Sequence, residues 1–193
     1  MTKYYFVRHG TTDFNGLGVY FGKTDTPLNV EGILQAKALG TSLSGVHFDE
    51  VYTSPMKRCV DTARFITDKR KPYVHDELSE LDFGRWEGLT FRQCREKDPE
   101  EFRKWSADYR NTAPPEGEKY TDFYERVREF YEEILVQKEG SILIVAHKGV
   151  LQLLVSLLLT GNDSLFWNFN FLLGKYSILE RYEDHCTINR LNV

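Results

Sequence analysis

The most constraining feature of this 193-residue sequence is the run Ser141–Ala146, apolar after its first residue, which leads directly into His147-Lys148-Gly149. Such a run is typical of a central parallel strand, because that strand is buried on both faces of its sheet. A shorter apolar stretch, Tyr4–Val7, ends in the same way at Arg8-His9-Gly10. Both stretches are therefore predicted to be buried strands, and each is closely followed by a histidine.

The rest of the chain alternates between strand-like and helix-like periodicity. Further strands are predicted at Glu50–Thr53, Lys71–His75, Tyr176–Tyr182 and Cys186–Leu191, the last two joined by a turn around Glu183-Asp184. Helices are predicted after Thr26–Asn29 through about Leu43, from Ser54-Pro55 to about Thr67, over the stripe Phe123, Val127, Phe130 and Ile134, and at Val150–Leu159. This alternation agrees with an α/β fold.

The length suits one domain, residues 1–193. Between about residues 82 and 120 the sequence becomes densely charged, is dotted with aromatic residues and ends in Pro114-Pro115-Glu116-Gly117. We expect this segment, the helical excursion (residues 82–120), to lie like a lid over one edge of the domain.

Composition excludes several classes of protein. With 25 Lys and Arg against 29 Asp and Glu the net charge is -4, which argues against a nucleic-acid partner. The run Val150–Leu159 is too short to cross a membrane. The N-terminus lacks the apolar core of a signal peptide, so we expect a cytoplasmic protein. Three scattered cysteines, Cys59, Cys94 and Cys186, indicate reduced thiols rather than disulfides or a zinc site.

The two histidines carry the strongest chemical signal. His9 and His147 both follow predicted buried strands, and ligands of open α/β sheets bind at the carboxyl ends of strands. Arg8 adds a positive charge at the end of the first strand. Arg58 lies in the first turns of the helix that follows the predicted strand Glu50–Thr53. Arginine forks and helix N-termini both bind phosphate oxygens. The residues therefore predict a cationic phosphate pocket without a metal, in which an imidazole attacks phosphorus.

These residues stand in a longer pattern that resembles the histidine phosphatase superfamily, which includes cofactor-dependent phosphoglycerate mutase. The matching blocks are Arg8-His9-Gly10-Thr11-Thr12 with Asn15 and Gly22, Thr26-Pro27-Leu28 to Gln35-Ala36, Ser54–Ala63, Leu78–Gly88 and Val145–Val150. They span the chain in the family's order. The resemblance implies a phosphoglycerate mutase-like, three-layer fold, with a mostly parallel central sheet and helices on both faces.

The resemblance also implies a role for each matching residue. His9 is the nucleophile that becomes phosphohistidine, held by the Gly10 carbonyl. The phosphate pocket is completed by Arg8, Asn15, Arg58 and His147, together with the backbone N–H of Lys148. Glu80 is the general acid, which protonates the leaving alkoxide and then activates water. Asp82 and Glu87 are the nearest competitors for that role. No metal or cofactor is expected.

Within the superfamily the sequence looks most like the α-ribazole phosphatases of cobalamin assembly. The interval from Glu80 to His147 is shorter than in the mutases, and the tail carries Gly161, Trp167, Phe169, Gly174, Ser177 and Leu191-Asn192 in similar order. Val19 stands where an arginine is frequent, and Phe21 where many relatives have a polar group. An apolar wall of this kind favours a bulkier, less anionic leaving group and hence a hydrolase.

The expected substrate is therefore a small phosphate ester, most specifically α-ribazole 5′-phosphate, with no nucleic-acid or membrane partner and a monomer or homodimer as the assembly. Stacking candidates for its base are Phe91, Trp86, Trp105, Tyr109 and Tyr120, unless they only hold the excursion in place. Phosphoglycerate would meet the acidic Glu116 and Glu118. Three alternatives remain open: a broad phosphatase of small esters, a phosphoglycerate mutase, and a non-catalytic module that binds phospho-ligands.

Overall fold

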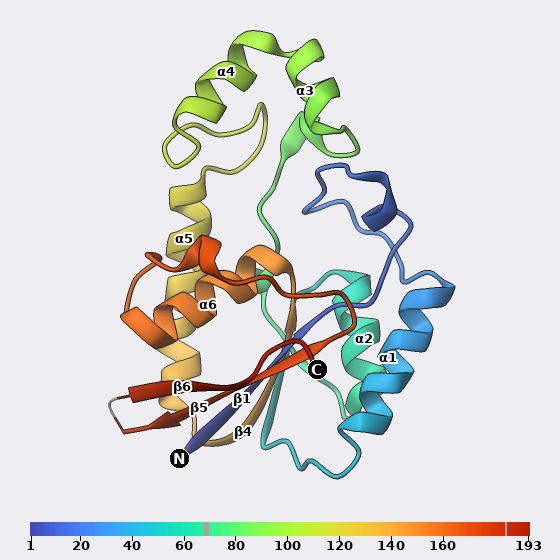
Figure 1. Cartoon of the computed structure of the whole chain (residues 1–193), viewed down its shortest axis with the longest axis vertical. Helices are drawn as coiled ribbons and strands as arrows, with labels where there is room; N and C mark the ends of the chain where they lie inside the picture. Colours follow the sequence, from blue (N-terminus) through green and yellow to red (C-terminus); the bar gives the residue numbers. More distant parts are fainter. Residues whose placement is uncertain (68–69, 184) are drawn as a thin grey trace.

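The computed structural model describes residues 1–67, 70–183 and 185–193. Six strands of the described chain form one sheet: β1 (Thr2–Arg8), β2 (Glu50–Thr53), β3 (Tyr73–Val74), β4 (Gly140–Ala146), β5 (Tyr176–Tyr182) and β6 (His185–Arg190). Their order is β3-β2-β4-β1-β5-β6 (Figure 1). The pairs from β3 to β1 are parallel, whereas β5 and β6 are antiparallel to their neighbours. The predicted mostly parallel α/β sheet is confirmed.

Helices cover both faces of this sheet (Figure 1). They are α1 (Val30–Ser42), α2 (Lys57–Thr67), α3 (Phe91–Lys97), α4 (Pro99–Ala107), α5 (Tyr120–Glu129) and α6 (Lys148–Thr160). Short 3₁₀ turns lie at Asn15–Leu17, Asp76–Leu78, Gly84–Trp86, Leu135–Gln137 and Phe166–Asn168, and a π turn at Phe130–Ile134 extends α5.

The alternation of side chains along the central strands creates one apolar core on each face of the sheet. Tyr4 and Phe6 of β1 point into the core beneath α5 and α6. Tyr5 and Val7 point into the opposite core, beneath α1 and α2. Residues Ile142–Ala146 of β4 are all buried, which is the reason for their continuous apolarity. Because β1, β2 and β4 are parallel, their carboxyl ends lie at the same end of the sheet.

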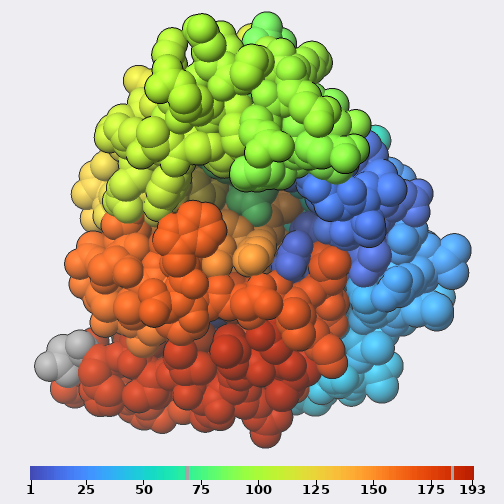
Figure 2. Space-filling model, turned by 45° about the horizontal axis from the view of Figure 1, so that its top comes forward, coloured from blue at the N-terminus to red at the C-terminus, as the bar shows by residue number. Residues whose placement is uncertain are grey.

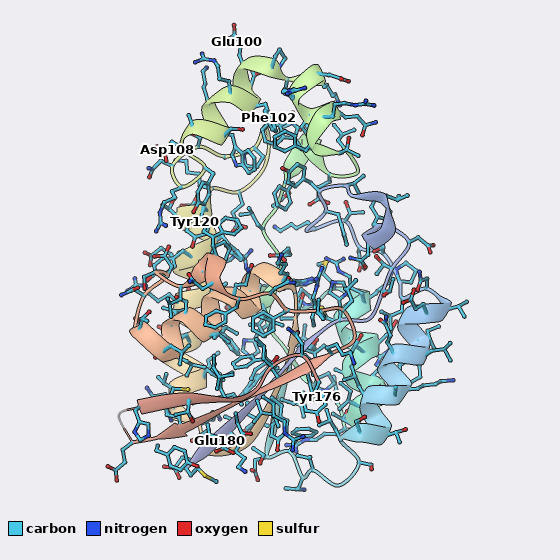
Figure 3. The ribbon with its side chains drawn as sticks, in the orientation of Figure 1. Glu100, Phe102, Asp108, Tyr120, Tyr176 and Glu180 are labelled. Carbon is cyan, nitrogen blue, oxygen red and sulfur yellow. The ribbon has the colours of Figure 1, made fainter. Side chains whose placement is uncertain are left out.

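The helical excursion (residues 82–120) contains α3 and α4 and has a small core of its own. Trp86, Cys94 and Phe102 are buried together there. Figure 3 shows Phe102 directed toward the inside of this segment and Glu100 directed away from it. One contact between the excursion and the N-terminal part of the chain is made by the backbone of Tyr20, whose N–H donates to Leu89 O at 2.9 Å and whose carbonyl accepts from Gly88 N at 2.8 Å.

Some predicted boundaries shift for physical reasons. The strand predicted at Lys71–His75 shrinks to Tyr73–Val74, because Pro72 has no N–H to donate to the sheet. The helix predicted from Ser54-Pro55 begins as α2 at Lys57. Of the predicted turn around Glu183-Asp184, Glu183 has a left-handed φ of 45°, and Asp184 lies outside the described residues.

Candidate active site

The carboxyl ends of β1 and β4 bring the two predicted histidines together. The parallel ladder extends into the loops, where His9 N donates to Ala146 O at 3.1 Å. The rings of His9 and His147 lie edge to face with centroids 5.2 Å apart, and both residues are 2% exposed. The sheet thus places two imidazoles from distant parts of the sequence in one buried position.

The hydrogen bond of His9 fixes which ring nitrogen carries its proton. Nδ1 lies 2.8 Å from the carbonyl oxygen of Gly10. Because a carbonyl oxygen only accepts, Nδ1–H donates and Nε2 keeps a free lone pair. Burial, with the positive charges of Arg58 and Arg8, holds the pKa of His9 well below its ordinary value despite this bond. His9 is therefore a neutral imidazole with Nε2 available as a nucleophile.

His147 carries its proton on the other nitrogen. Its Nδ1 lies 3.3 Å from Nη2 of Arg58, which can only donate, so Nε2–H donates to Ser54 Oγ at 2.8 Å. Burial and the charge of Arg58 lower the pKa of His147 well below its ordinary value. From the sequence, Ser54 is predicted only as the start of a helix. Its position at the end of β2, the strand next to β4, gives it this second contact.

The two predicted arginines are held by backbone carbonyls. Arg58 is fully buried, and its Nη1 and Nη2 donate to Thr24 O at 2.8 Å and Gly22 O at 2.6 Å. Arg8 Nη1 donates to Phe171 O at 2.8 Å. The Nε atoms of Arg8 and Arg58 are buried and have no partner among the described residues. Buried charged donors of this kind are satisfied when an anion with several oxygens binds between them.

Glu80 lies against the start of α6, beside this pocket. Its Oε2 accepts from Gly149 N at 3.0 Å and its Oε1 from Leu81 N at 3.1 Å. A Cβ at position 149 would lie 2.5 Å from Oε1, so only glycine allows the carboxylate this close. Burial lowers the pKa of Arg8, and the nearby charge of Glu80 partly offsets this lowering. The carboxyl group therefore shares the electrostatic environment of the pocket.

The two competing acidic residues are occupied by the backbone. Glu87 accepts from the N–H groups of Gly22, Lys23 and Thr24 at 3.0, 2.8 and 2.6 Å. It thereby fixes the same loop whose carbonyls hold Arg58. Asp82 accepts from Gly84 N at 2.8 Å. Glu80 also accepts from backbone N–H groups, but of the three carboxyl groups only Glu80 is among the described residues that line the cavity beside Arg8 and Lys148, which favours it as the group that faces a substrate.

Asn15 and Lys148 lie near the same edge. The side-chain oxygen of Asn15, Oδ1, accepts from Thr12 N at 2.8 Å and from Thr12 Oγ1 at 3.0 Å, which leaves the side-chain NH₂ group as the donor. Lys148 is the first residue of α6, where a backbone N–H has no partner within the helix. Both groups are therefore able to donate hydrogen bonds, and their role as phosphate donors stays a prediction.

A cavity of about 670 Å³ opens beside Arg8, Glu80 and Lys148, in the hollow between the excursion and the body (Figure 2). Its walls are mostly aromatic: Tyr20, Phe21, Phe83, Phe91, Trp105, Tyr109, Tyr120, Phe123, Phe166 and Trp167, with Val19 and Leu81. The predicted apolar wall of Val19 and Phe21 is thus confirmed. Phe21 also packs its ring 5.1 Å from the Arg58 guanidinium.

Three predicted contributors to the cavity lie elsewhere. Trp86 is fully buried in the excursion's own core, where its Nε1 donates to Asp98 at 2.9 Å, so it is not a stacking residue. Glu118 pairs with Arg126 at 2.7 Å, and Glu116 lies near the exposed Arg85. Neither glutamate lines the cavity. The prediction that phosphoglycerate would meet these two glutamates in the cavity is therefore wrong.

The structure adds Gln152, a cavity residue that the sequence analysis did not single out. It is buried on α6, and its Nε2 donates to Phe169 O at 2.6 Å. A lone amide inside the apolar run Val150–Leu159 was the available signal. Trp167 was named only as one of the C-terminal residues that resemble the α-ribazole phosphatases. In the structure it lines the cavity, and its side chain is 68% exposed.

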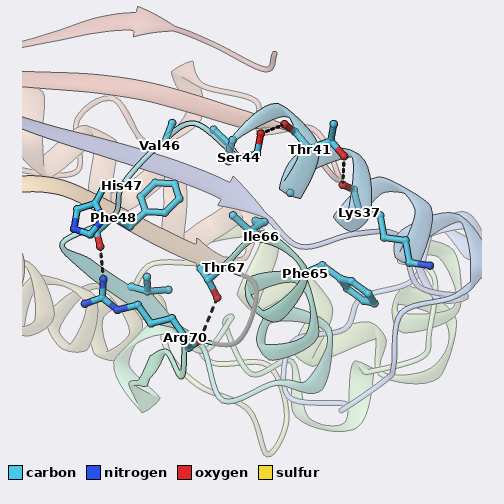
Figure 4. A pocket seen from close by; sticks show the side chains of 13 residues that line it. Lys37, Thr41, Ser44, Val46, His47, Phe48, Phe65, Ile66, Thr67 and Arg70 are labelled. Carbon is cyan, nitrogen blue, oxygen red and sulfur yellow. Dashed lines mark hydrogen bonds between the residues drawn. The ribbon is translucent and has the colours of Figure 1, made fainter.

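A second cavity, of about 740 Å³, lies at the opposite edge of the sheet, where the chain enters β2 (Figure 4). Its lining includes Lys37, Val46, Phe48 and Phe65. It contains none of the residues predicted to carry chemistry. The aromatic cavity, by contrast, is lined by Arg8, Glu80 and Lys148, and two of these residues are the sequence neighbours of His9 and His147.

Comparison with known proteins identifies the family. The model of the histidine phosphatase superfamily (branch 1) matches residues 4–193, nearly the whole chain. The chain belongs to the histidine phosphatase superfamily. This histidine phosphatase is 37% identical over 189 residues to the adenosylcobalamin/alpha-ribazole phosphatase of Salmonella typhimurium, covering 96% of this chain and 94% of the relative. It is 33% identical to phosphoserine phosphatase 1 of Hydrogenobacter thermophilus, covering 100% and 93%.

Solved structures agree with this assignment. A crystal structure described as a putative alpha-ribazole-5′-P phosphatase from Escherichia coli superimposes with a TM-score of 0.93 at 33% identity, over 100% of this chain and 96% of that one. This histidine phosphatase is thus a phosphoric monoester hydrolase with small phosphate esters as substrates. No helix among the described residues is long and apolar enough to cross a membrane.

Proposed function

We propose that this histidine phosphatase hydrolyses α-ribazole 5′-phosphate through a phosphohistidine on His9. The observation that carries the proposal is the hydrogen bond from His9 Nδ1 to Gly10 O at 2.8 Å, which leaves Nε2 unprotonated in a cationic pocket. A neutral imidazole held in one tautomer is the form that attacks phosphorus.

In the first half-reaction the Nε2 lone pair forms a bond to phosphorus while the ester P–O bond breaks. The oxygen of the leaving alcohol takes a proton from the Glu80 carboxyl group. The unpartnered Nε–H groups of Arg8 and Arg58 donate to the phosphoryl oxygens and stabilise the charge that builds up on them. The Asn15 NH₂ group and the Lys148 backbone N–H complete this set of donors. His147 completes the pocket beside them by accepting from Arg58 and donating to Ser54.

In the second half-reaction water attacks the phosphohistidine. The Glu80 carboxylate takes the water proton, the new P–O bond forms, and the P–N bond breaks. Inorganic phosphate leaves, His9 regains its lone pair, and Glu80 is again protonated for the next ester. The pocket's own positive charges do the work that a divalent ion does in other phosphatases, so no metal is required.

The shape of the cavity supports the substrate. An aromatic base attached to a ribose would be buried against the aromatic wall, and a base stacked on an aromatic side chain gains about 1–3 kcal/mol. The wall also includes the polar side chain of Gln152, which a ribose hydroxyl could meet. The names of the relatives from Salmonella typhimurium and Escherichia coli point to the same ester.

Phosphoserine is the second candidate, because the Hydrogenobacter thermophilus relative is named a phosphoserine phosphatase and is covered over 93% of its length. Its amino-acid leaving group is small and charged, and would leave most of an aromatic cavity of about 670 Å³ unused. The two substrates therefore differ in how much of the wall they contact.

The test is to measure kcat/KM for α-ribazole 5′-phosphate, phosphoserine and 3-phosphoglycerate with the same enzyme. We expect the α-ribazole ester to exceed both others by at least about tenfold, since one base–aromatic contact corresponds to about that factor. Interconversion of phosphoglycerates should be absent even with bisphosphoglycerate present. A higher efficiency for phosphoserine would reassign the substrate, and equal efficiency for all three would indicate a broad phosphatase.

A further inference from the structure

Arg126, on α5, holds the chain segment that leads into Glu80. Its Nη1 donates to Glu77 O and Ser79 O, both at 2.7 Å, and its Nη2 donates to Glu80 O at 3.1 Å. One guanidinium group thus binds three carbonyls within four consecutive residues. The segment has no regular helix or strand after Leu78 to fix it otherwise.

A carboxylate sets the orientation of that guanidinium. Glu118 Oε1 accepts from Arg126 Nε at 2.7 Å, and Oε2 accepts from Nη2 at 2.9 Å. Together with the three carbonyls, these bonds use all five N–H donors of the arginine. The Phe123 ring, 4.8 Å away, packs against the guanidinium. Both charged side chains of the pair are about one-fifth exposed, so the pair is largely shielded from water.

The same phenylalanine connects this clamp to the carboxyl group itself. A Cβ at Gly149 would lie 3.3 Å from the tip of the Phe123 ring and 2.5 Å from Glu80 Oε1. The carboxyl group, the start of α6 and Phe123 therefore pack in one place. A shift of the Glu80 backbone would move the carboxyl group off Gly149 N, which it now contacts at 3.0 Å.

We propose that Arg126, oriented by Glu118, is a positioning residue that holds Glu80 where it can deliver a proton to the leaving alcohol. The proposal rests on the proposed role of Glu80 as the general acid. Since all five of its N–H donors are engaged within the protein, Arg126 has none left for the substrate, and its contact with the proposed acid is through the Glu80 segment. A lysine could not replace it, because three rotatable N–H donors cannot span three carbonyls and a carboxylate.

The consequence is a selective loss of acid catalysis. An alkyl phosphate releases a poor leaving group that needs a proton, whereas 4-nitrophenyl phosphate releases a stable anion that does not. The experiment compares kcat/KM for α-ribazole 5′-phosphate and 4-nitrophenyl phosphate, because this ratio reports the steps up to release of the alcohol. The variants are Arg126→Met, Glu80→Gln and the double variant. The matched control is Arg128→Gln, on the same helix but paired with the exposed Glu125 and Glu132 and not bonded to the Glu80 segment in the described part of the chain.

We expect Arg126→Met to lower kcat/KM for the alkyl ester by about ten- to a hundredfold, within the range of general acid catalysis, and that for 4-nitrophenyl phosphate by less than about threefold. The double variant should be no worse than Glu80→Gln alone, because both changes remove the same proton transfer. Arg128→Gln should match the wild type. Glu118→Gln keeps the arginine and should give the same substrate dependence in milder form, which covers a failure of Arg126→Met to fold.

Equal losses on the two esters, or losses that multiply in the double variant, would overturn the positioning role and leave the proposed function intact. If Glu80→Gln itself lowers kcat/KM for both esters equally, the acid is not Glu80, and the proposed role of Arg126 is wrong as well.

Discussion

The imidazoles of His9 and His147 lie with their ring centroids 5.2 Å apart and carry their protons on opposite nitrogens, Nδ1 in His9 and Nε2 in His147. The Nδ1 lone pair of His147 is directed at the Arg58 guanidinium, whereas the Nε2 lone pair of His9 is left for the substrate. Hydrogen bonds to neighbouring groups therefore leave His9, the proposed nucleophile, with a free lone pair, whereas both ring nitrogens of His147 have partners. Two residues of the same type are thus given different chemistry.

This arrangement predicts a pH-dependent stability. Burial and Arg58 lower the pKa of both histidines in the folded protein, so below about pH 6.5 the unfolded state binds more protons than the folded state. The free energy of unfolding should be constant above that pH and fall below it, by up to about 1.4 kcal/mol per pH unit for each histidine. Urea unfolding in phosphate-free buffer at several pH values measures this slope.

The variant that tests the cause is His147→Asn, which should make the slope shallower. His47→Asn, at a side chain that is 87% exposed, should leave the slope unchanged. An unaltered slope in His147→Asn would show that other groups produce the pH dependence.

Arg58→Ala should weaken phosphate recognition. The substitution removes a buried charge and leaves the carbonyls of Gly22 and Thr24 without their donors. Removal of one such transition-state donor costs about a hundred- to a thousandfold in rate. We expect that loss in kcat/KM, with weaker inhibition by vanadate. The control Arg64→Ala, on the same helix but exposed and paired with Asp61, should behave as wild type.

Chelation should leave the enzyme active, because the arginines and the neutral imidazoles supply the electrostatic stabilisation. The measurement is kcat/KM after prolonged dialysis against EDTA, with vanadate as a competitive inhibitor to confirm an intact phosphate pocket. Loss of activity that a divalent ion restores would contradict this prediction.

The aromatic wall should set substrate preference. Trp167 lies at the cavity wall, where its Nε1 donates to Tyr109 OH at 2.9 Å. Because its side chain is 68% exposed, its truncation should not unfold the protein. We expect Trp167→Ala to lower kcat/KM for α-ribazole 5′-phosphate by about tenfold, one stacking contact, and to leave phosphoserine nearly unchanged. Phe65→Ala, on α2 and outside the wall, is the control. A uniform loss on both esters would indicate a structural role.

The local pattern of apolar residues was enough to predict the sheet and the pairing of the two histidines. A buried parallel strand is a continuous apolar run, and the end of that run marks the carboxyl end of the strand. It failed where long-range contacts decide. In sequence, nothing distinguishes Trp86 from the aromatic residues that line the cavity. Tertiary packing nevertheless buries it with Phe102 in the excursion's own core. The pairing of Glu118 with Arg126 depends on how the excursion returns to α5, which no local spacing reveals.

The most direct test of the account is to trap the phosphorylated enzyme. Wild-type protein mixed briefly with labelled substrate and quenched in base should carry an acid-labile, base-stable phosphoryl group, and peptide mapping should place it on His9. His9→Ala should carry no label and lose several decades of kcat, the scale of covalent catalysis. The account would be contradicted if His9→Ala kept more than about a tenth of the wild-type rate, or if the label lay on another residue.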